Sequence, residues 1–537
     1  MKITTLALTS LISLTALQLS AKTLYVVKDG KFTEHAHRQG NSWKESGQVA
    51  IGKNTGQRLA FRHKVQGNEF SVSTKLSLTK LNHTSAGIYM GTEFFGFDGQ
   101  RGLFTEGGSF GGVSFYKGPE LTAGEPFTFV ASGKDGKISF SINGQHIVTK
   151  PYDQSFVRGI ALRPHRGEMN IHEFKVSGTI SELEKLNHLF ACGTEGYKSY
   201  RIPALVTTTK GSLLAFCEGR KHGSGDHGDI DIVMKRSTDG GKTWSPLQVV
   251  HDNHNHVAGN PAPIIDQQSG RIHLLSCTSA HHEYAIYQGK GRRGIFIQHS
   301  DDDGQTWSSP RDIASNIYPE NWRWYATGPC SGIQIREGKH AGRLVCPANH
   351  TYVEEGSDKN HFRAHCIFSD DHGKTWQLGG SSAFGGNESS IAEAGNDLLY
   401  QSIRMQSHRK GVRGTRYSRD GGETWTELKH DQNLPCPMCQ GAVIRDYSQS
   451  KRLIHSNPGT RNGRNGMTIR ISDDGGQSWP LAKTILNTSS AYSDISLTKD
   501  GDIAILFEGG HYAYSQEGII FNIYPQKEIK EKPAGQK

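Results

Sequence analysis

The stretch Ser237-Thr-Asp-Gly-Gly-Lys-Thr-Trp244 decides the fold, because its pattern Ser-x-Asp-x-Gly-x-x-Trp occurs five times in this chain. The later copies begin at Ser300, Ser369, Ser418 and Ser472. Successive copies start 63, 69, 49 and 54 residues apart, and together they use five of the eight tryptophans. A repeat of this period with β-type flanks predicts a β-propeller, in which each blade needs its neighbours to bury its faces.

The repeated motif is interpreted as a hairpin turn. Its glycine would take the position with positive φ, and its aspartate would accept hydrogen bonds from nearby backbone N–H groups. The serine hydroxyl would do likewise, while the tryptophan folds back and buries a large apolar area beside the strand. Each copy carries a carboxylate, but this pattern favours a structural role for the five aspartates over a catalytic one.

Length and composition indicate a β-rich protein of two folded units. A chain of 537 residues is too long for one ordinary core, and 64 glycines with only 7 methionines are typical of strands joined by tight turns. The formal charge of +9 suits an anionic partner. The basic residues are scattered singly, which argues against nucleic acid as that partner. An acidic sugar or polymer fits as well, and so does a charge that merely keeps the protein soluble.

The first 21 residues resemble a secretory signal peptide. Lys2 precedes an apolar stretch that ends at Leu19, and small residues follow through Ala21. No later segment offers the ~18 uninterrupted apolar residues that a membrane span needs. We therefore expect a protein without a membrane span that is secreted or periplasmic.

All eight cysteines lie after residue 190, and an exported protein could join them in disulfides. Their connectivity cannot be deduced from the sequence. The motif Cys436-Pro-Met-Cys439 lacks a second such pair or a nearby pair of histidines, so it is a weak zinc candidate. Buried free thiols or one strained pair are the alternatives that we favour.

Residues 22–178 contain no copy of the repeat and no cysteine. Polar and apolar residues alternate there, as in Phe70–Leu78 and Lys137–Ile142, and the dipeptide Asn143-Gly144 predicts a hairpin turn. Short alternating strands separated by turns predict a two-sheet β-sandwich. The stretch resembles the lectin-like jelly rolls attached to many secreted carbohydrate-active enzymes, which leaves glycan binding and a structural spacer as alternatives.

The rest of the chain divides into a linker, the repeat region and a tail. Residues 179–187 are expected to form a short linker helix, with Ser181 as N-cap and Glu184 three residues further on. Residues 188–524 leave room for six blades, one of them without the motif. Residues 525–537 are a charged tail that we expect to fray. The predicted fold is therefore all-β: a six-bladed β-propeller preceded by a β-sandwich.

Propellers are scaffolds, so function has to be argued from particular residues. The residues that could carry chemistry occur in the following motifs: Tyr200-Arg201-Ile-Pro-Ala204, Glu218-Gly-Arg220, Gly223–Asp231, Asn387-Glu388, Arg404, Arg464, Tyr492 and Glu508. With the five repeats, this set resembles the secreted bacterial-type exo-α-sialidases (neuraminidases) over about residues 186–524. The resemblance implies an enzyme that hydrolyses terminal sialic acid from glycoproteins, glycolipids or oligosaccharides with retention of configuration, without a cofactor or metal.

The resemblance assigns Arg201, Arg404 and Arg464 as a triad that binds the carboxylate of sialic acid. The chemistry agrees, because a guanidinium group meets a carboxylate with a planar two-point fork that lysine cannot match. Three guanidinium groups would repel one another, so a fixed counter-carboxylate is expected. By the family pattern, Glu508 is the candidate partner of Arg201. Taken singly, each of these arginines could equally be one half of a surface ion pair.

The resemblance also assigns Tyr492 as the nucleophile and Glu388 as the base that accepts its proton. Sialidases depart from most retaining glycosidases in using a tyrosine. A neutral phenol avoids the repulsion between a carboxylate nucleophile and the substrate's own carboxylate, but with a pKa of ~10 it needs a base. The alternatives are a packed strand residue for Tyr492 and a plain loop residue for Glu388.

The acid that protonates the leaving oxygen is assigned to Asp226, in a glycine-rich loop that could hold its carboxylate at the mouth of a site. Asp229 is the next candidate, whereas Asp231 lies in an alternating run and is expected to be structural. Arg220 is expected to line the site and hold Glu388 or the substrate.

Further recognition residues are less sharply defined by the sequence. Trp324 and Tyr325 lie in a segment that resembles the family's pocket region, where aromatic rings could pack against the acetamido or glycerol arm. An ordinary core role is the alternative for Trp324. The histidine-rich stretch His251–His256 could suggest a metal site, but it lacks the i, i+4 spacing of helical zinc sites.

The sequence leaves three other functions open. A non-catalytic propeller of the same blade design could bind a partner, although it would have no reason to keep the set of arginines with Tyr492. Another glycosidase or lyase acting on an acidic sugar would use a carboxylate nucleophile. Transfer to another sugar or intramolecular formation of an anhydro sugar would use the same residues as hydrolysis.

Overall fold

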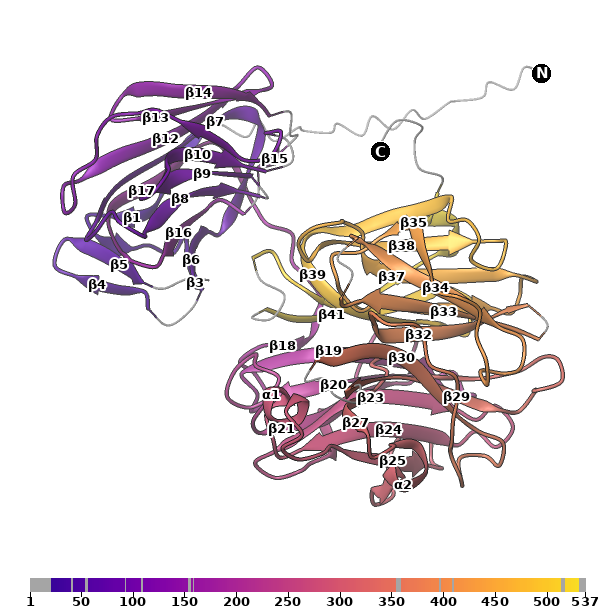
Figure 1. Ribbon diagram of the computed structural model, residues 1–537. Coiled ribbons are helices and arrows are strands. Elements are labelled where there is room, and N and C mark those ends of the chain that lie inside the picture. Colours follow the sequence, from indigo (N-terminus) through magenta and orange to yellow (C-terminus); the bar gives the residue numbers. More distant parts are fainter. Residues whose placement is uncertain are drawn as a thin grey trace, which may run out of the picture. The chain divides into compact units, whose positions relative to one another are not determined.

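The computed structural model describes residues 21–530 except 40–41, 54–56, 92, 108–109, 153–155, 158, 354–358, 396, 408–409 and 513–516. The expected signal peptide lies almost wholly outside the described residues, as does the end of the expected tail, residues 531–537. The chain divides after Glu184 into two compact units. The first is coloured indigo to purple and the second magenta to yellow in Figure 1.

The first unit is a sandwich of two antiparallel sheets. One sheet has the order β14-β13-β12-β7-β17-β1-β2, with β15 on β7, β5 on β17 and β4 on β5, and the other has the order β11-β10-β9-β8-β16-β6-β3. The strands have these bounds: β1 Lys22–Lys28, β2 Lys31–Phe32, β3 Ala36–Gln39, β4 Lys44–Ser46, β5 Val49–Lys53, β6 Arg58–Phe61, β7 His63–Leu78, β8 Ser85–Met90, β9 Glu93–Asp98, β10 Gly102–Glu106, β11 Ser114–Tyr116, β12 Phe127–Lys134, β13 Lys137–Ile142, β14 Gln145–Pro151, β15 Phe156–Val157, β16 Ala161–His165 and β17 Glu168–Glu182.

The core of the sandwich is built by alternation along these strands. Every second residue of β12 is buried, as the sequence pattern predicts for a sheet with one face inward. Phe95 of β9 stacks on Phe140 of β13 with ring centroids 4.3 Å apart, and it meets Phe129 of β12 edge-on at 5.4 Å. Asn143 and Gly144 have φ of 48° and 81° and form the predicted hairpin turn between β13 and β14.

The second unit is a β-propeller, and its described residues form six blades. The first two blades consist of β19 Ser199–Thr207, β20 Leu213–Arg220, β21 Ile230–Ser237 and β22 Gln248–His251, and of β23 Val257–Ile265, β24 Ile272–Ser279, β25 Gly294–Ser300 and β26 Arg311–Asp312. The next two consist of β27 Trp322–Thr327, β28 Ile333–Gln334, β29 Leu344–Val353, β30 Asn360–Ser369 and β31 Gln377–Leu378, and of β32 Gly386–Gly395, β33 Leu398–Met405, β34 Val412–Ser418 and β35 Lys429–Pro435. The last two consist of β36 Ala442–Asp446, β37 Arg452–Pro458, β38 Asn465–Ser472, β39 Leu481–Leu497, β40 Ile503–Gly509, β41 Gly518–Tyr524 and β18 His188–Ala191.

Short helical turns lie between some of the strands of this unit. They are α1 Glu283–Tyr287, α2 Ala314–Ile317 and the 3-10 turn η1 Gln526–Glu528. Among the described residues, no helix is long and apolar enough to cross a membrane.

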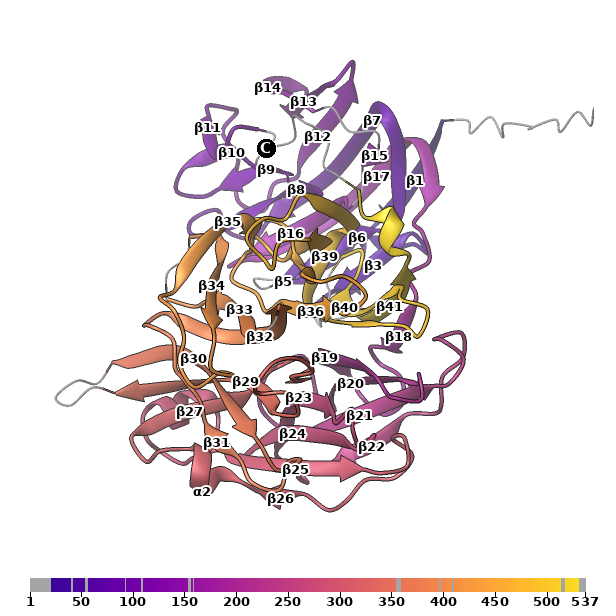
Figure 2. The ribbon, with the colours of Figure 1, turned by 90° about the vertical axis from the view of Figure 1, so that its right-hand side faces the viewer.

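The two ends of the second unit close the propeller. β18, at its beginning, pairs antiparallel with β41, at its end, and the two lie side by side in Figure 2. β39 serves two blades, because its first half pairs with β38 and its second half with β40. The sixth blade thus takes its outermost strand from the other end of the chain and needs no turn there, which explains why it lacks the repeated motif.

Each copy of the motif forms the turn that follows the third strand of a blade. Its serine is the last residue of that strand, and its hydroxyl lies 2.7–2.8 Å from an aspartate oxygen in all five copies. The glycine N–H donates to the serine oxygen at 2.8–2.9 Å, and the backbone N–H of the residue before the tryptophan donates to the aspartate at 2.9 Å. The five glycines have φ between 80° and 98°. These contacts support the structural interpretation of the aspartates.

The expected linker helix at residues 179–187 is wrong. β17 continues to Glu182, and its residues pair with β7 up to the match of Glu182 with His63. Ser181, expected as an N-cap, instead accepts a hydrogen bond from Nε2 of Gln66 at 3.1 Å. Strand pairing with a long neighbour outweighs the local capping pattern, which can act only where a helix has begun.

All eight cysteines are free thiols, and seven of them are buried. Burial raises the pKa of Cys439 to about 12, so this thiol is inert as a nucleophile. Cys436 and Cys439 hold their turn by a hydrogen bond from the Cys439 N–H to the Cys436 sulfur at 3.4 Å. Of the two alternatives that the sequence left open, the free thiols are the correct one.

The turn contacts predict the effect of Asp302→Ala on stability. Hydrogen bonds from Thr306 lower the pKa of Asp302 to about 2, so its stabilising effect is complete above the ordinary aspartate pKa of ~3.9 and is lost as the pH falls through about 2. We expect Asp302→Ala to lower the free energy of unfolding by about 1 kcal/mol at pH 7, measured by urea denaturation. The difference from the wild type should shrink as the pH falls from about 4 to about 2.

Asp500→Ala is the control, because Asp500 is exposed and belongs to a turn outside the repeats. An Asp302→Ala variant as stable as Asp500→Ala would contradict the structural role of the motif.

Candidate active site

The candidate site lies at the end of the propeller where the first strands of the blades begin and the second strands end. Arg201 and Glu388 lie near the starts of β19 and β32, and Tyr492 lies where β39 passes into the sixth blade. Arg404 and Glu508 lie near the ends of β33 and β40. The repeat turns follow third strands and therefore lie at the opposite end. The candidate site and the stabilising repeat turns therefore lie at opposite ends of the blade strands.

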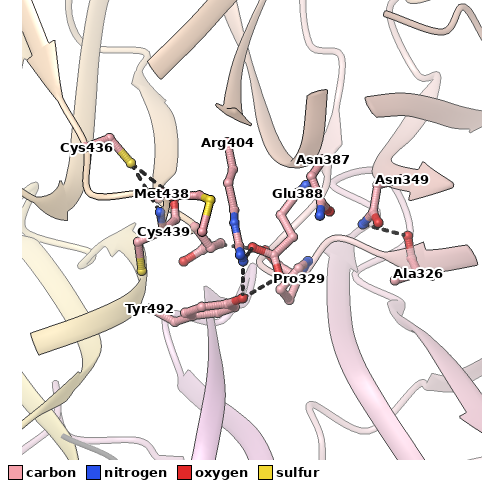
Figure 3. A network of polar contacts seen from close by, with 12 residues as sticks. Ala326, Pro329, Asn349, Asn387, Glu388, Arg404, Cys436, Met438, Cys439 and Tyr492 are labelled. Carbon is pink, nitrogen blue, oxygen red and sulfur yellow. Dashed lines mark hydrogen bonds and ion pairs between the residues drawn. The ribbon is translucent and has the colours of Figure 1, made fainter. Parts of the chain in front are cut away.

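Tyr492, Glu388 and Arg404 form one hydrogen-bonded cluster (Figure 3). The Tyr492 hydroxyl donates to Oε1 of Glu388 in a short hydrogen bond. Nη1 of Arg404 donates to the Tyr492 oxygen at 2.7 Å and to Oε2 of Glu388 at 2.6 Å. Burial raises the pKa of Tyr492 well above that of a free phenol, although Arg404 acts in the opposite direction. The phenol is therefore neutral, with a carboxylate already placed to accept its proton.

Arg201 is fixed by a buried carboxylate from the far end of the chain. Its Nε and Nη2 donate to the two oxygens of Glu508 at 3.1 and 3.2 Å, and the backbone N–H of Ile202 donates to Glu508 at 2.9 Å. The Glu508 side chain is fully buried. The two-point geometry leaves the Arg201 guanidinium no freedom to turn away, and it confirms the pairing expected from the sequence.

Three guanidinium groups converge on the Tyr492 ring. The Cζ atoms of Arg201 and Arg464 lie 5.4 and 5.5 Å from the ring centroid, and Arg404 contacts the hydroxyl. Arg464 also donates from Nη2 to the backbone oxygen of Met438 at 3.4 Å. Nε of Arg404 is buried and has no hydrogen-bond partner among the described residues, so it keeps a donor for a bound anion. The geometry fits a single small carboxylate held above the tyrosine.

Asp226 lies beside two of the site's arginines. Its Oδ1 lies 2.7 Å from Nη1 of Arg220 and 3.4 Å from Nη1 of Arg201. The surrounding protein partly removes water from the Asp226 carboxylate, which would raise its pKa, but Arg220 and Arg201 outweigh this effect and hold the pKa below its ordinary value. The side chain is 64% exposed, which places the carboxylate at the mouth of the site.

The two other aspartates of this loop face elsewhere. Asp229 pairs with Nζ of Lys221 at 2.9 Å. Asp231 is buried in the blade, where it accepts a hydrogen bond from the Tyr197 hydroxyl at 2.6 Å. Of the three candidates, Asp226 is the one that contacts the arginines of the site.

Trp324 and Tyr325 differ in their surroundings. Tyr325 is fully buried in the core between the second and third blades, with its ring 5.0 Å from that of Tyr318, so the expectation that it lines a pocket is corrected. Adjacent strand residues point to opposite faces, and Trp324 is half-buried on the other face. Its ring packs 5.8 Å from Tyr287 of α1 and under the guanidinium of Arg293, at 4.3 Å from Cζ.

Two supporting residues, Gln440 and Glu218, were given no role by the sequence. The Gln440 amide accepts from the Ser493 N–H and donates to the Ser493 carbonyl, both at 2.9 Å, and so braces the strand next to Tyr492. Oε2 of Glu218 accepts from Nε and Nη2 of Arg220 at 3.1 and 2.6 Å, so Arg220 is held by Glu218 and not by Glu388. Glu218 lies two residues before Arg220 in a strand, and this same-face spacing was the available signal. Gln440 follows Cys439 in a turn and gave none.

Among the described residues, no group of three or more His, Cys, Asp or Glu side chains could hold a metal ion. His251 of the histidine-rich stretch is buried and lies 2.9 Å from the Ser276 hydroxyl through Nδ1. Asp226 and Glu388 are each held by arginine, Asp226 by Arg220 and Glu388 by Arg404.

Residues 211–505, more than half of the chain, match the family of BNR repeat-like domains. The chain is 33% identical over 336 residues to a sialidase of Micromonospora viridifaciens, which covers 59% of this chain and 51% of that protein. It is 32% identical over 303 residues to an exo-alpha-sialidase of Aspergillus fumigatus, which covers 52% of this chain and 69% of that protein. The matches thus span about half to two thirds of these relatives.

Solved structures share the fold at lower identity. The Hadza microbial sialidase Hz136 matches with a TM-score of 0.58 and 24% identity, covering 88% of this chain and 96% of that one. A leech intramolecular trans-sialidase matches with a TM-score of 0.54 and 17% identity, covering 89% of this chain and 98% of that one. Likenesses of this size establish the fold and leave the reaction to be argued from the site.

The buried pair of Arg201 and Glu508 predicts the effect of Glu508→Gln. Removing the charge of Glu508 takes away the buried two-point partner of Arg201 while two other guanidinium groups remain nearby, and we expect the free energy of unfolding to fall by about 3–5 kcal/mol in urea denaturation. The double variant Arg201→Gln/Glu508→Gln should recover part of this loss, because no uncompensated charge remains. Glu528→Gln, which breaks the exposed pair of Glu528 with Lys483, is the control and should change little. A Glu508→Gln variant as stable as that control would show that the pair is not needed.

Proposed function

The chain belongs to the bacterial-type sialidase family, and from this premise we propose that it is an exo-α-sialidase. Its substrates would be the terminal sialic acids of glycoproteins, glycolipids or oligosaccharides. The observation that carries the proposal is the convergence of Arg201, Arg404 and Arg464 on Tyr492. A sialic acid bears a carboxylate on its anomeric carbon, so arginines that hold the carboxylate also place that carbon beside the phenol.

The first half of the reaction would form a tyrosyl intermediate. The Tyr492 oxygen attacks the anomeric carbon while its proton passes to Glu388, with which it already shares a hydrogen bond. The bond to the leaving oxygen breaks, and Asp226 donates a proton to that oxygen. Arg404 holds both the phenol and the base, so it stabilises the negative charge that passes between them.

The second half would reverse these roles. Asp226 accepts a proton from a water molecule, whose oxygen bonds to the anomeric carbon on the face the leaving group vacated. The bond between that carbon and Tyr492 breaks, and the phenol recovers its proton from Glu388. Two displacements at one carbon give net retention of configuration.

Asp226 must be protonated to act as an acid, yet Arg220 and Arg201 lower its pKa in the free protein. A bound substrate carboxylate would offset the positive charge of the arginines and raise the pKa of Asp226. Substrate binding would therefore prepare the acid that the reaction needs, which is a use of binding energy at the reacting centre.

We propose in addition that the protein is exported, because residues 1–21 resemble a signal peptide. Mass spectrometry of the protein from periplasm and medium would test this, and an unprocessed Met1 in cytoplasmic protein would contradict it.

The sandwich unit is proposed to bind glycans, by its likeness to lectin-like domains. A glycan array probed with the full chain carrying Tyr492→Phe would test that, and binding to no glycan would leave the unit a spacer.

Tyr492→Phe removes the nucleophile and keeps the ring between the arginines. We expect the wild type to release sialic acid from sialyllactose, and kcat of the variant to fall by about 1000-fold or more while the Kd for a sialic acid analogue stays within a few-fold. NMR of the first product formed by the wild type should show the retained anomer. A wild type that releases no sialic acid between pH 4 and 8, or an active Tyr492→Phe variant, would contradict the proposal.

Asp226→Ala should affect substrates according to how much their leaving group needs a proton. We expect kcat/KM to fall by about 100-fold or more for sialyllactose but by less than about tenfold for a nitrophenyl sialoside. In the wild type, kcat/KM for sialyllactose should rise as the pH falls towards the lowered pKa of Asp226, and the variant should lose this dependence. Asp229→Ala is the matched control from the same loop and should leave the ratio between the substrates unchanged. Equal losses on both substrates in Asp226→Ala would mean that another group is the acid.

A further inference from the structure

A cationic cavity lies in the propeller unit, away from the candidate active site. Its volume is about 620 Å³, and its lining residues include Arg271, His273, His299, Arg311, His372 and Lys374. Among the described residues, no acidic and no aromatic side chain other than the histidines lines it, and Ser308 and Ser309 add hydroxyl groups. The cavity thus combines several basic side chains with a volume typical of ligand sites.

The strands place this cavity at the end of the propeller opposite the active site. Its residues come from the beginning of β24, from β25 and β26, and from His372 to Lys374 in the third repeat turn. The repeat turns follow the third strands, whereas the active site lies where those strands begin. A ligand in the cavity therefore cannot be the group that reacts at Tyr492.

The charges of the cavity are only partly neutralised. Arg271 is paired at two points with Asp301, at 2.7 and 2.9 Å, and His372 lies 2.8 Å from the buried carboxylate of Asp266. Arg311 contacts only a backbone oxygen, that of Gly373 at 3.0 Å, and Lys374 forms no ion pair among the described residues. Arg311 and Lys374 therefore bring positive charge that no carboxylate in the lining offsets.

His273 supplies a second, independent observation. It is 3% exposed, lines the cavity, and its Nε2 is buried without a hydrogen-bond partner among the described residues. Burial lowers the pKa of His273 to about 4, so the ring is neutral and carries one N–H at physiological pH. A buried imidazole nitrogen without a partner is costly, and here it lies in a residue that lines the cavity.

We propose that this cavity binds the sulfate or phosphate ester group of an acidic glycan. A guanidinium, an ammonium, hydroxyls and an imidazole are suited to the oxygens of a tetrahedral oxyanion. The absence of carboxylates in the lining disfavours a divalent cation, and the absence of Phe, Tyr and Trp disfavours stacked nucleic-acid bases. The volume leaves room for the sugar that carries the ester.

Such a site would tether the protein to an acidic glycan while the opposite face remains open to substrate. A tether raises the effective concentration of reactive groups on the same matrix without any new contact at the active site. The proposal goes beyond the proposed hydrolysis and does not depend on it.

The test is calorimetric titration of the full chain with a sulfated disaccharide, its unsulfated counterpart, inorganic sulfate and inorganic phosphate, at physiological ionic strength. The variants are Arg311→Gln, Lys374→Gln and the charge-retaining Arg311→Lys. Lys242→Gln is the matched control, because Lys242 is exposed and holds the same place in the first repeat turn as Lys374 does in the third. Hydrolysis of a nitrophenyl sialoside is measured in parallel.

We expect the wild type and Lys242→Gln to bind the sulfated disaccharide and not the unsulfated one. Arg311→Gln and Lys374→Gln should each weaken this binding by about tenfold or more, with partial rescue in Arg311→Lys. Hydrolysis should be the same in every variant. Absence of binding to the wild type, or equal weakening in Lys242→Gln, would overturn the proposal. Inorganic anions that bind as tightly as the sulfated disaccharide would overturn the assignment to a glycan.

Discussion

The site depends on holding several guanidinium groups close together without their mutual repulsion destabilising the fold. Arg201, Arg404 and Arg464 surround one phenol ring, and a buried charge without a partner is strongly destabilising. Glu508 compensates the first at two points, and Glu388 the second. Three guanidinium groups around one ring make the site suited to an anionic ligand. The same carboxylate that compensates Arg404 is also the group that can take the proton of the phenol, so charge balance and chemistry are joined in one residue.

The propeller solves the problem of assembling these groups from distant parts of the chain. Arg201 and Glu508 are 307 residues apart, and they meet because β18 and β41 close the ring of blades. Each blade contributes the beginning of one strand and the end of another to the same face, so one architecture supplies several side chains at one point. The repeat turns lie on the opposite face, so the residues that stabilise the blades are distinct from those that form the site. The neutral, buried phenol is a consequence of this enclosure, because burial raises the pKa of Tyr492.

Much of this could be predicted from the sequence, because the decisive signals are local or repeat. The turn motif has a chemical reason for each of its residues and appears five times, so it indicates five blades, and the length of residues 188–524 leaves room for a sixth. The arginines and Tyr492 form a set whose order along the chain is characteristic. The prediction of a linker helix was wrong because these residues extend β17, which pairs with β7. This pairing is a tertiary effect that a local capping pattern around Ser181 does not reveal. The prediction that Tyr325 lines a pocket was wrong because strand alternation, and not aromatic character, decides which of two neighbouring residues faces the core. Gln440 and the cationic cavity could not be foreseen, since both depend on residues that only the folded chain brings together.

A crystal structure with a dehydrated analogue of sialic acid soaked into the protein tests the central claim most directly. We expect the ligand's carboxylate to lie within hydrogen-bond distance of all three guanidinium groups, with the ligand's ring over the Tyr492 hydroxyl and Asp226 at the side of the missing leaving group. A ligand bound elsewhere, or a carboxylate that contacts none of Arg201, Arg404 and Arg464, would contradict it.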